Sequence, residues 1–362
     1  MRNRRRWTAS PRNSRPPCSH EECRRISWQY VLAADVGGTT AALALAAAGK
    51  AARPEIIAQR VYASQEFEGL QPILADFLQQ PAVAGHRGAI AAACFSVAGP
   101  VASNSTTLTN LGWKISGDAL AVELRLPEVR LVNDFSAAGR GIPRLAPSEL
   151  ETLQAGRLVG QATRLIIGAG TGLGVGLLTW QDDGYTAHPS EAGHADFAPV
   201  DEIQDQLLVH LRRTFGRVSY ERVVSGPGLM RIFSFLQESG AGIPSRQLRE
   251  ASKKNVDTAE VIAEFAMAKV DPLAVRSLDV FIAAYGAFAG NMALTTLARG
   301  GVYLSGGIAP KIAAKLRDGI FMRAFTSKGR FSDLLEMIPV QVVMNPQVGL
   351  HGALLEAHAL IR

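Results

Sequence analysis

The 362-residue sequence has few cysteines and lacks the short motifs of zinc modules and of the commonest nucleotide-binding loops. Its three cysteines, Cys18, Cys23 and Cys94, are too few for a disulfide framework, which favours a reducing, cytoplasmic compartment. Cysteine and histidine do not cluster at metal-ligand spacings, and no Gly-Lys-Ser/Thr follows a glycine loop. Cys94 falls within the apolar run 89–97, where we predict a small buried side chain.

Positive charge is also scarce outside the amino-terminal segment. Residues 1–27 hold eight arginines and two glutamates, which equals the whole net charge of +6. The rest of the chain carries 30 basic and 30 acidic residues. Nucleic-acid binding needs a basic face on a folded module, whereas these arginines stand among Pro, Ser and Asn. We therefore predict a disordered basic extension over 1–27 and no nucleic-acid partner, with an electrostatic anchor or a targeting segment as alternatives.

One uncharged stretch, residues 280–298, is long enough to be tested as a membrane span. It is rich in Ala, Gly and Thr, and it contains Asn291. Gly286 and Gly290 lie four residues apart, which leaves one helix face small enough for close packing. We therefore predict a buried helix here and no membrane partner.

Short apolar runs that end in turn residues alternate with helix-like segments along the chain. Strands are predicted at residues 30–34, 88–97, 129–132, 164–167, 301–305 and 340–344. Helices are predicted at 70–78, 203–214, 228–236, within 245–280 with a connection at 253–255, from about Pro310, and at 349–361. Residues 43–47 fit either a returning strand or an Ala-rich helix. This alternation is typical of the α/β class, and the length favours two domains.

Two strands run directly into glycine turns, at residues 35–39 and 168–176, which predicts two related halves facing a shared nucleotide. Glycine lets backbone N–H groups approach phosphate oxygens. In 168–176 the glycines occupy every second position, a spacing that fits either a phosphate loop or a closely packed hairpin. Asp35 beside the first turn suits a hydrated magnesium ion on a polyphosphate, or an ordinary turn cap. Gly306-Gly307 fits a nucleotide site before a helix, or a simple turn.

Several polar residues stand at strand ends or in loops. Asn133-Asp134 ends a strand, so Asp134 is either a helix N-cap or a general base at the carboxyl end of a parallel strand. Glu191 and His194 follow Pro189-Ser190 and are predicted to lie in a loop, as a structural hydrogen-bonded pair or as part of a site. Glu221 is either a binding-site residue or a member of a surface ion pair.

Taken in order, these motifs resemble the bacterial glucokinase family, the hexokinase-type enzymes of the actin-like ATPase superfamily. The resemblance covers about residues 29–362. The matching segments are residues 34–39, 98–101, 108–113, 132–135, 168–175, 191–199, 221–229, 305–310, 328–331 and 349–352.

The resemblance implies a two-domain α/β fold of the actin-like ATPase (ribonuclease H-like) kind, with a cleft between the domains. The small domain would span 28–144 and be completed by about 346–362, and the large domain would span 145–345. The implied reaction is ATP-dependent phosphorylation of glucose at the 6-hydroxyl, with ATP and Mg²⁺ as cofactors. A homodimer is also expected from the resemblance.

The resemblance also assigns roles residue by residue. Asp134 would be the general base, and Asn133, Glu191, His194 and Glu221 would hydrogen-bond the other sugar hydroxyls. Asp35 would position magnesium through water. The ATP phosphates would lie along Gly37, Gly38, Thr39, Gly170, Thr171 and Gly172, and the adenosine beside Gly306 and Gly307.

The chain departs from the family pattern in two loops. Thr40, Ala41 and Ala42 stand where the family usually has Asn or Lys followed by Arg, and Ser190 and Ala192 replace glycines of the sugar loop. Three alternatives therefore stay open. They are a kinase for another hexose, a weakly catalytic sensor of hexose and nucleotide, and a sugar kinase of the repressor–open-reading-frame–kinase (ROK) group. The last is disfavoured because no cysteine lies near His194.

Overall fold

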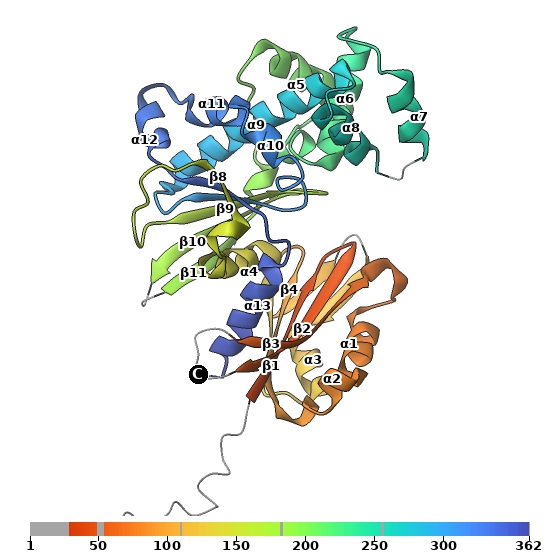
Figure 1. Cartoon of the computed structure of the whole chain (residues 1–362), viewed down its shortest axis with the longest axis vertical. Coiled ribbons are helices and arrows are strands. Elements are labelled where there is room, and N and C mark those ends of the chain that lie inside the picture. Colours follow the sequence, from red (N-terminus) through yellow and green to blue (C-terminus); the bar gives the residue numbers. More distant parts are fainter. Residues whose placement is uncertain (1–28, 49–53, 109–110, 182–183, 255–256, 362) are drawn as a thin grey trace, which may run out of the picture.

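The computed structural model describes residues 29–48, 54–108, 111–181, 184–254 and 257–361. The predicted basic extension at 1–27 lies outside the described residues. Figure 1 shows two sheets, one above the other, with helices α4 (Asp134–Gly141) and α13 (Val348–Ala359) between them.

The amino-terminal sheet has five strands in the order β3-β2-β1-β4-β7. Its first three strands are antiparallel neighbours, and β4 and β7 run parallel to β1. The strands are β1 (Gln29–Val36), β2 (Thr40–Ala48), β3 (Glu55–Ala63), β4 (Ile90–Val97) and β7 (Val129–Asn133). The same half holds α1 (Leu70–Gln79), α2 (Pro81–Ala84), α3 (Gly117–Leu124) and the hairpin of β5 (Ser105–Leu108) and β6 (Trp113–Ser116).

The second sheet has six strands in the order β11-β10-β9-β12-β13-β8. They are β8 (Leu150–Gln154), β9 (Arg164–Ala169), β10 (Leu173–Gln181), β11 (Gly184–Ser190), β12 (Val302–Ser305) and β13 (Val340–Val343). The helices of this half are α5 (Glu202–Phe215), α6 (Gly226–Glu238), α7 (Arg246–Lys254), α8 (Thr258–Met267), α9 (Pro272–Thr296), α10 (Ala313–Leu316), α11 (Ile320–Thr326) and α12 (Ser332–Glu336).

The two sheets repeat one topology. In the second sheet β9, β10 and β11 are antiparallel neighbours, and β12 and β13 run parallel to β9, as β4 and β7 do to β1. β8 is added antiparallel at the β13 edge. This confirms the repeat predicted from the two glycine turns, since β1–β2 and β9–β10 are equivalent hairpins. The α/β class is also confirmed.

Residues 43–47 form part of strand β2 although alanine favours helices. The segment pairs with β1 and β3 on its two edges. Ala44 and Ala46 pack in a small core with Leu350 and Ala353 of α13, and Cys94 lies buried in the same core as predicted. Tertiary pairing therefore overrides the local propensity.

Helix α9 contains the predicted buried segment. It meets the length and composition test for a membrane span, but 78% of its most apolar window is buried inside the protein. A Cβ at Gly286 or Gly290 would collide with the backbone of Phe321 or Phe325 on α11. The predicted close packing of this face is confirmed.

Two local predictions were wrong. The helix after β12 begins at Ala313 rather than near Pro310, and it has four residues. The chain stays irregular there because the Ile308 N–H bonds back to Ala169 O at 3.1 Å, and Gly306 has a φ of +82°. Lys253 and Lys254, expected in a connection, end α7 instead; Asn255 lies outside the described residues.

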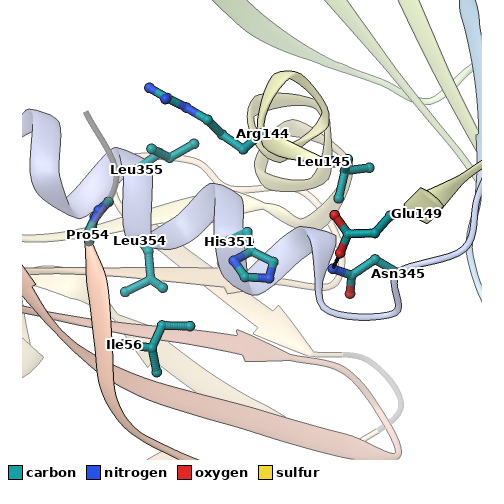
Figure 2. Close-up of a pocket in the computed structure, with 9 residues that line it drawn as sticks. All are labelled: Pro54, Ile56, Arg144, Leu145, Glu149, Asn345, His351, Leu354 and Leu355. Carbon is teal, nitrogen blue, oxygen red and sulfur yellow. Dashed lines mark hydrogen bonds between the residues drawn. The ribbon is translucent and has the colours of Figure 1, made fainter. Parts of the chain in front are cut away.

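The chain crosses between the halves at two neighbouring places. One crossing leaves α4 through the 3-10 helices Ile142–Arg144 and Pro147–Glu149 into β8, and the other leads from β13 into α13. Asn345 Nδ2 donates to Glu149 Oε1 at 2.6 Å, and Met344 N donates to Glu149 O at 2.8 Å. Figure 2 shows the first of these bonds at one end of a cavity of about 250 Å³ between α13 and the first crossing.

Candidate active site

The hairpin β9–β10 is bonded to three other segments of the candidate site. Its Gly170 O accepts from the Gly226 N–H at 2.8 Å, and its Ala169 O accepts from the Ile308 N–H at 3.1 Å. Its Leu173 N–H donates to Glu221 Oε2 at 3.0 Å. Segments that lie 48 to 139 residues from this hairpin in the sequence are thus bonded to its turn.

The alternate glycines of this hairpin face helix α4. A Cβ at Gly168 or Gly174 would collide with the Phe135 ring, and one at Gly176 would press on Phe135 and Ile166. Because the glycines occupy every second position, the face of the hairpin that packs against α4 has no side chains, and the Phe135 ring lies on it. In the turn, a Cβ at Gly170 would meet open space, whereas one at Gly172 would lie 2.6 Å from Glu221 Oε2. Gly170 and Thr171 therefore remain for a ligand.

Asp134 is the first residue of α4 and not its N-cap. Asn133 is the cap, and its Oδ1 accepts from the N–H groups of Phe135 and Ser136 at 3.0 and 3.3 Å. The Asn133 amide also donates to Asp134 Oδ1 at 2.9 Å and to Gly99 O at 3.0 Å. The N-cap alternative for Asp134 is therefore wrong, and its carboxylate is held by its neighbours.

Two carboxylates share one cavity. Asp35 lies at the carboxyl end of β1 beside Ser96 of β4, whose Oγ donates to Asp35 Oδ1 at 2.6 Å. Burial raises the pKa of Asp35, and the bond from Ser96 opposes that rise. Burial also raises the pKa of Asp134 to about 7, and the charge of Asp35 adds to the increase. Asp134 is consequently poised to take up or release a proton near neutral pH.

The shared cavity has a volume of about 460 Å³ and lies where several element ends converge. The ends of β1, β12 and β13 and the first residues of α4 and α13 line it. Carboxyl ends of parallel strands and helix N-termini are where α/β folds bind anionic ligands. Its lining comprises Asp35, Asp134, Phe135, Ala138, Ser305, Gly306, Gly307, Pro310, Lys311, Val343, Met344, Asn345, Pro346, Val348 and Gly349.

A second cavity of about 640 Å³ adjoins the first, because Gly307 and Lys311 line both. It is mainly apolar and has Gly170 and Thr171 at one wall. The size suits a nucleotide base and ribose. The other lining residues are Gly226, Pro227, Leu229, Met230, Asp257, Ala259, Glu260, Ala263, Glu264, Met267, Ile308 and Ile312.

Glu191, His194 and Glu221 gather on the other side of the hairpin turn. His194 forms one 3-10 turn with its neighbours, in the predicted loop after β11. Its ring nitrogens lie 3.9 Å from Glu191 Oε2 and 4.0 Å from Glu221 Oε1. Glu221 Oε2 also accepts from the Leu173 N–H at 3.0 Å, so the backbone of the hairpin holds this side chain in addition to its approach to His194. Two carboxylates and an imidazole in loops offer hydrogen bonds to a polyhydroxy ligand.

The first glycine turn is placed differently. Gly37 N donates to Thr40 O at 2.8 Å, and Ser64 ties the turn by bonds to Gly37 O and Thr39 O. Gly37, Gly38 and Thr39 follow Asp35 directly but are not among the residues lining either cavity. The same holds for Asn133, Gly172, Glu191, His194 and Glu221.

Sequence reasoning missed several residues of the site. Ser96 holds Asp35, and Gly349 lies so close that a Cβ there would be 2.5 Å from Asp35 Oδ2. Lys311 and Phe135 were also not singled out as site residues. Gly349 stood within one of the matching motifs, but nothing in the sequence places Ser96 opposite Asp35.

The donors present fit a magnesium-bound nucleotide. No group of three or more His, Cys, Asp and Glu side chains in the described part of the chain could hold a metal ion alone. Magnesium on a polyphosphate needs only one or two carboxylates and keeps several waters. Asp35 supplies such oxygens in a cavity that Gly306 and Gly307 also line.

Solved structures share this fold. A glucokinase from an Antarctic psychrotroph matches with a TM-score of 0.77 and 28% identity, covering 92% of this chain and 99% of that one. A ROK-family glucokinase from Streptomyces griseus, solved with glucose and AMPPNP, matches with a TM-score of 0.60 over 91% of this chain and 99% of that one. At 20% identity the second match concerns the fold alone. Fold and site together define a sugar kinase of the actin-like ATPase class.

The family follows from sequence matches. The glucokinase family model matches residues 32–360. The glucokinases of Trichormus variabilis and Synechocystis sp. are 42% and 43% identical, covering 91% and 89% of this chain and 99% and 96% of theirs. The chain therefore belongs to the glucokinase family. The preference for this branch over the ROK group is confirmed.

Proposed function

We propose that this chain transfers the γ-phosphoryl group of ATP to the 6-hydroxyl of glucose, giving glucose 6-phosphate and ADP. One observation carries the mechanism. Asp134, whose pKa burial raises to about 7, lines a cavity that adjoins a nucleotide-sized one. A buried carboxylate near neutral pKa is what a hydroxyl-activating base requires.

Asp134 takes the proton from the attacking hydroxyl. Its Oδ1 already accepts from the Asn133 amide and from the Phe135 N–H, which orients the carboxylate. Phosphoryl transfer needs little covalent chemistry from the protein, so alignment and charge stabilisation supply the rest of the acceleration. A positioned base contributes about 10²–10⁴-fold.

The other sugar hydroxyls are held by Asn133, Glu191, His194 and Glu221. The near contacts of His194 with both glutamates allow the three groups to exchange hydrogen bonds with a ring of hydroxyls. Charged partners make the strongest of such bonds. A hexose whose hydroxyls match these groups would give each hydroxyl a hydrogen-bonding partner.

The nucleotide lies along the glycine turns. Gly170, Thr171 and Gly172, with Gly37, Gly38 and Thr39, face the phosphates, and Gly306 and Gly307 lie beside the adenosine. Gly307 supports this because a Cβ there would meet open space, as at Gly170. Asp35 would hold magnesium through water, and the ion would supply positive charge to the phosphoryl group.

The remaining parts of the proposal concern the whole molecule. The halves at about 28–144 with 346–362 and at 145–345 act as domains that close over the sugar, which excludes water and limits ATP hydrolysis. We place the enzyme in the cytoplasm, where a buried free thiol such as Cys94 stays reduced. A homodimer is proposed on the resemblance alone.

The test is ADP release from Mg-ATP with a panel of hexoses, run beside Asp134→Ala. Glucose-dependent turnover should fall by about 10²-fold or more in the variant. Calorimetric glucose binding in the same preparation checks that the variant is folded. Turnover with a different hexose would overturn the substrate and keep the mechanism. Saturable glucose binding with no turnover in the unmodified protein would indicate the sensor instead.

A further inference from the structure

Lys311 stands at the junction of the two cavities. It follows β12 in the irregular segment before α10, and with Gly307 it is one of the two residues that line both cavities. A ligand that extends from the apolar cavity towards Asp134 would therefore lie beside Lys311 and Gly307.

The charges around that passage are unbalanced. Asp35 and Asp134 line one cavity, and the other is lined by Asp257, Glu260 and Glu264. Lys311 is the single lysine or arginine among the described residues that line either cavity. A polyphosphate entering this acidic region needs a compensating positive charge.

The turn after β1 brings no such charge. Thr39, Thr40, Ala41 and Ala42 are all uncharged, although this turn follows Asp35 directly. Lys311 is thus the protein cation best placed for the phosphates.

The ion pair of Lys311 with Glu260 is weak. The lysine Nζ lies 2.5 Å from Glu260 Oε1, with the two side chains 64% and 45% exposed. Ion pairs this exposed add little to stability, so breaking this one costs little. The lysine side chain is also long and flexible, with a compact charge at its end.

We propose that Lys311 leaves Glu260 when the nucleotide binds and contacts its polyphosphate, acting as a nucleotide-binding residue for phosphoryl transfer. Glu260 is then the ion-pair partner of Lys311 in the absence of nucleotide, and it competes with the phosphates for the lysine. This inference rests on the proposed function, because it takes ATP as the ligand of these cavities.

The experiment measures calorimetric binding of Mg-ADP and of adenosine to the full chain and to two variants, Lys311→Met and Glu260→Gln. In Lys311→Met the dissociation constant for ADP should rise about tenfold, while that for adenosine stays unchanged. In Glu260→Gln the dissociation constant for ADP should fall several-fold, because Lys311 is released and one negative charge is removed. The two variants thus break the same pair and shift ADP binding in opposite directions.

Two further variants serve as controls. Lys311→Arg should restore most of the ADP affinity. Arg317→Met removes a cation six residues further along the chain, whose ion pair with Glu151 at 2.9 Å has side chains 56% and 34% exposed, and it should leave ADP binding unchanged. Arg317 lines neither cavity.

Unchanged ADP affinity in Lys311→Met would overturn the inference. So would a weakening of ADP and adenosine alike in both variants, which would mean that the pair only supports the fold. Failure of the proposed function is distinct, since it would appear as a lack of glucose-dependent turnover in the unmodified protein.

Discussion

At the scale of residues, the site depends on how two buried carboxylates divide their roles. Ser96 supplies one hydrogen bond to Asp35, whereas Asp134 accepts from both the Asn133 amide and the Phe135 N–H. Burial raises the pKa of each, and the proximity of Asp35 raises that of Asp134 further. A base can act only when it is deprotonated, so the activity should follow the ionisation of Asp134.

We predict that kcat/KM for glucose rises with pH up to about 7 and levels off above it, because Asp134 of the free enzyme loses its proton there. Below that pH the value should fall about tenfold per unit. Steady-state rates at saturating Mg-ATP across this range test the prediction. Residual turnover in Asp134→Asn should lack this dependence. A decrease that begins only near the ordinary carboxyl pKa of 3.8 would contradict the assignment.

At the scale of elements, helices α4 and α13 and the hairpin β9–β10 fix the positions of the two acids. A Cβ at Gly352 of α13 would collide with Ala137 O of α4, and one at Gly141 would collide with Val348 O. The helices therefore touch backbone to backbone, and Phe135 locks α4 onto the hairpin. Small residues at these contacts are needed for close approach rather than for flexibility.

Gly174→Ala should lower the free energy of unfolding by about 1–3 kcal/mol, because the added methyl group presses on the Phe135 ring. It should also lower kcat/KM, since Phe135 neighbours Asp134. Urea unfolding and steady-state kinetics measure the two effects. Adding Phe135→Leu should recover part of the stability by making room.

Gly160→Ala provides the matched control for that variant. Its Cβ would meet open space, so stability should change by less than about 0.5 kcal/mol. Equal stability of Gly174→Ala and the unmodified protein would show that the alternate glycines are not required for packing.

At the scale of the whole molecule, two halves of one topology are joined by two crossings. Glu149 on the first crossing is bonded to Asn345 and Met344 on the second. The halves are thus connected at one side, beside the cavity drawn in Figure 2, and the candidate site involves residues from both. Motion about these crossings would move the amino-terminal sheet relative to the second sheet, whose hairpin β9–β10 carries one wall of the nucleotide cavity.

We expect saturating glucose to reduce the radius of gyration, because bonds from both halves to one sugar favour the closed arrangement. Small-angle X-ray scattering with and without glucose measures the change. Glu221→Ala, which removes a proposed sugar contact, should need more glucose for the same reduction. Identical radii in both conditions would contradict closure.

Much of the fold was predictable because its signals are local. Strands β1, β4, β7, β9, β12 and β13 and the long helices follow from apolar periods and glycine turns within short windows. β3, β8, β11 and the small hairpin β5–β6 were not predicted. The residues of β3, β8 and β11 are partly exposed and carry no strong alternation, so only pairing with neighbours makes them strands. The two hairpin strands have four residues each, too few for a clear period even though β6 alternates.

The sequence by itself determined the class, the order of the strands and helices with strong apolar periods, the repeat and the residues that match the family's motifs. Only the tertiary structure decided that the alternate glycines receive Phe135, that Ser96 holds Asp35, and that Lys311 joins two cavities. Ser96 lies 61 residues from Asp35 in sequence, and the parallel register of β1 and β4 places them side by side. Contacts of this kind depend on register and packing across the fold, which short-range patterns do not encode.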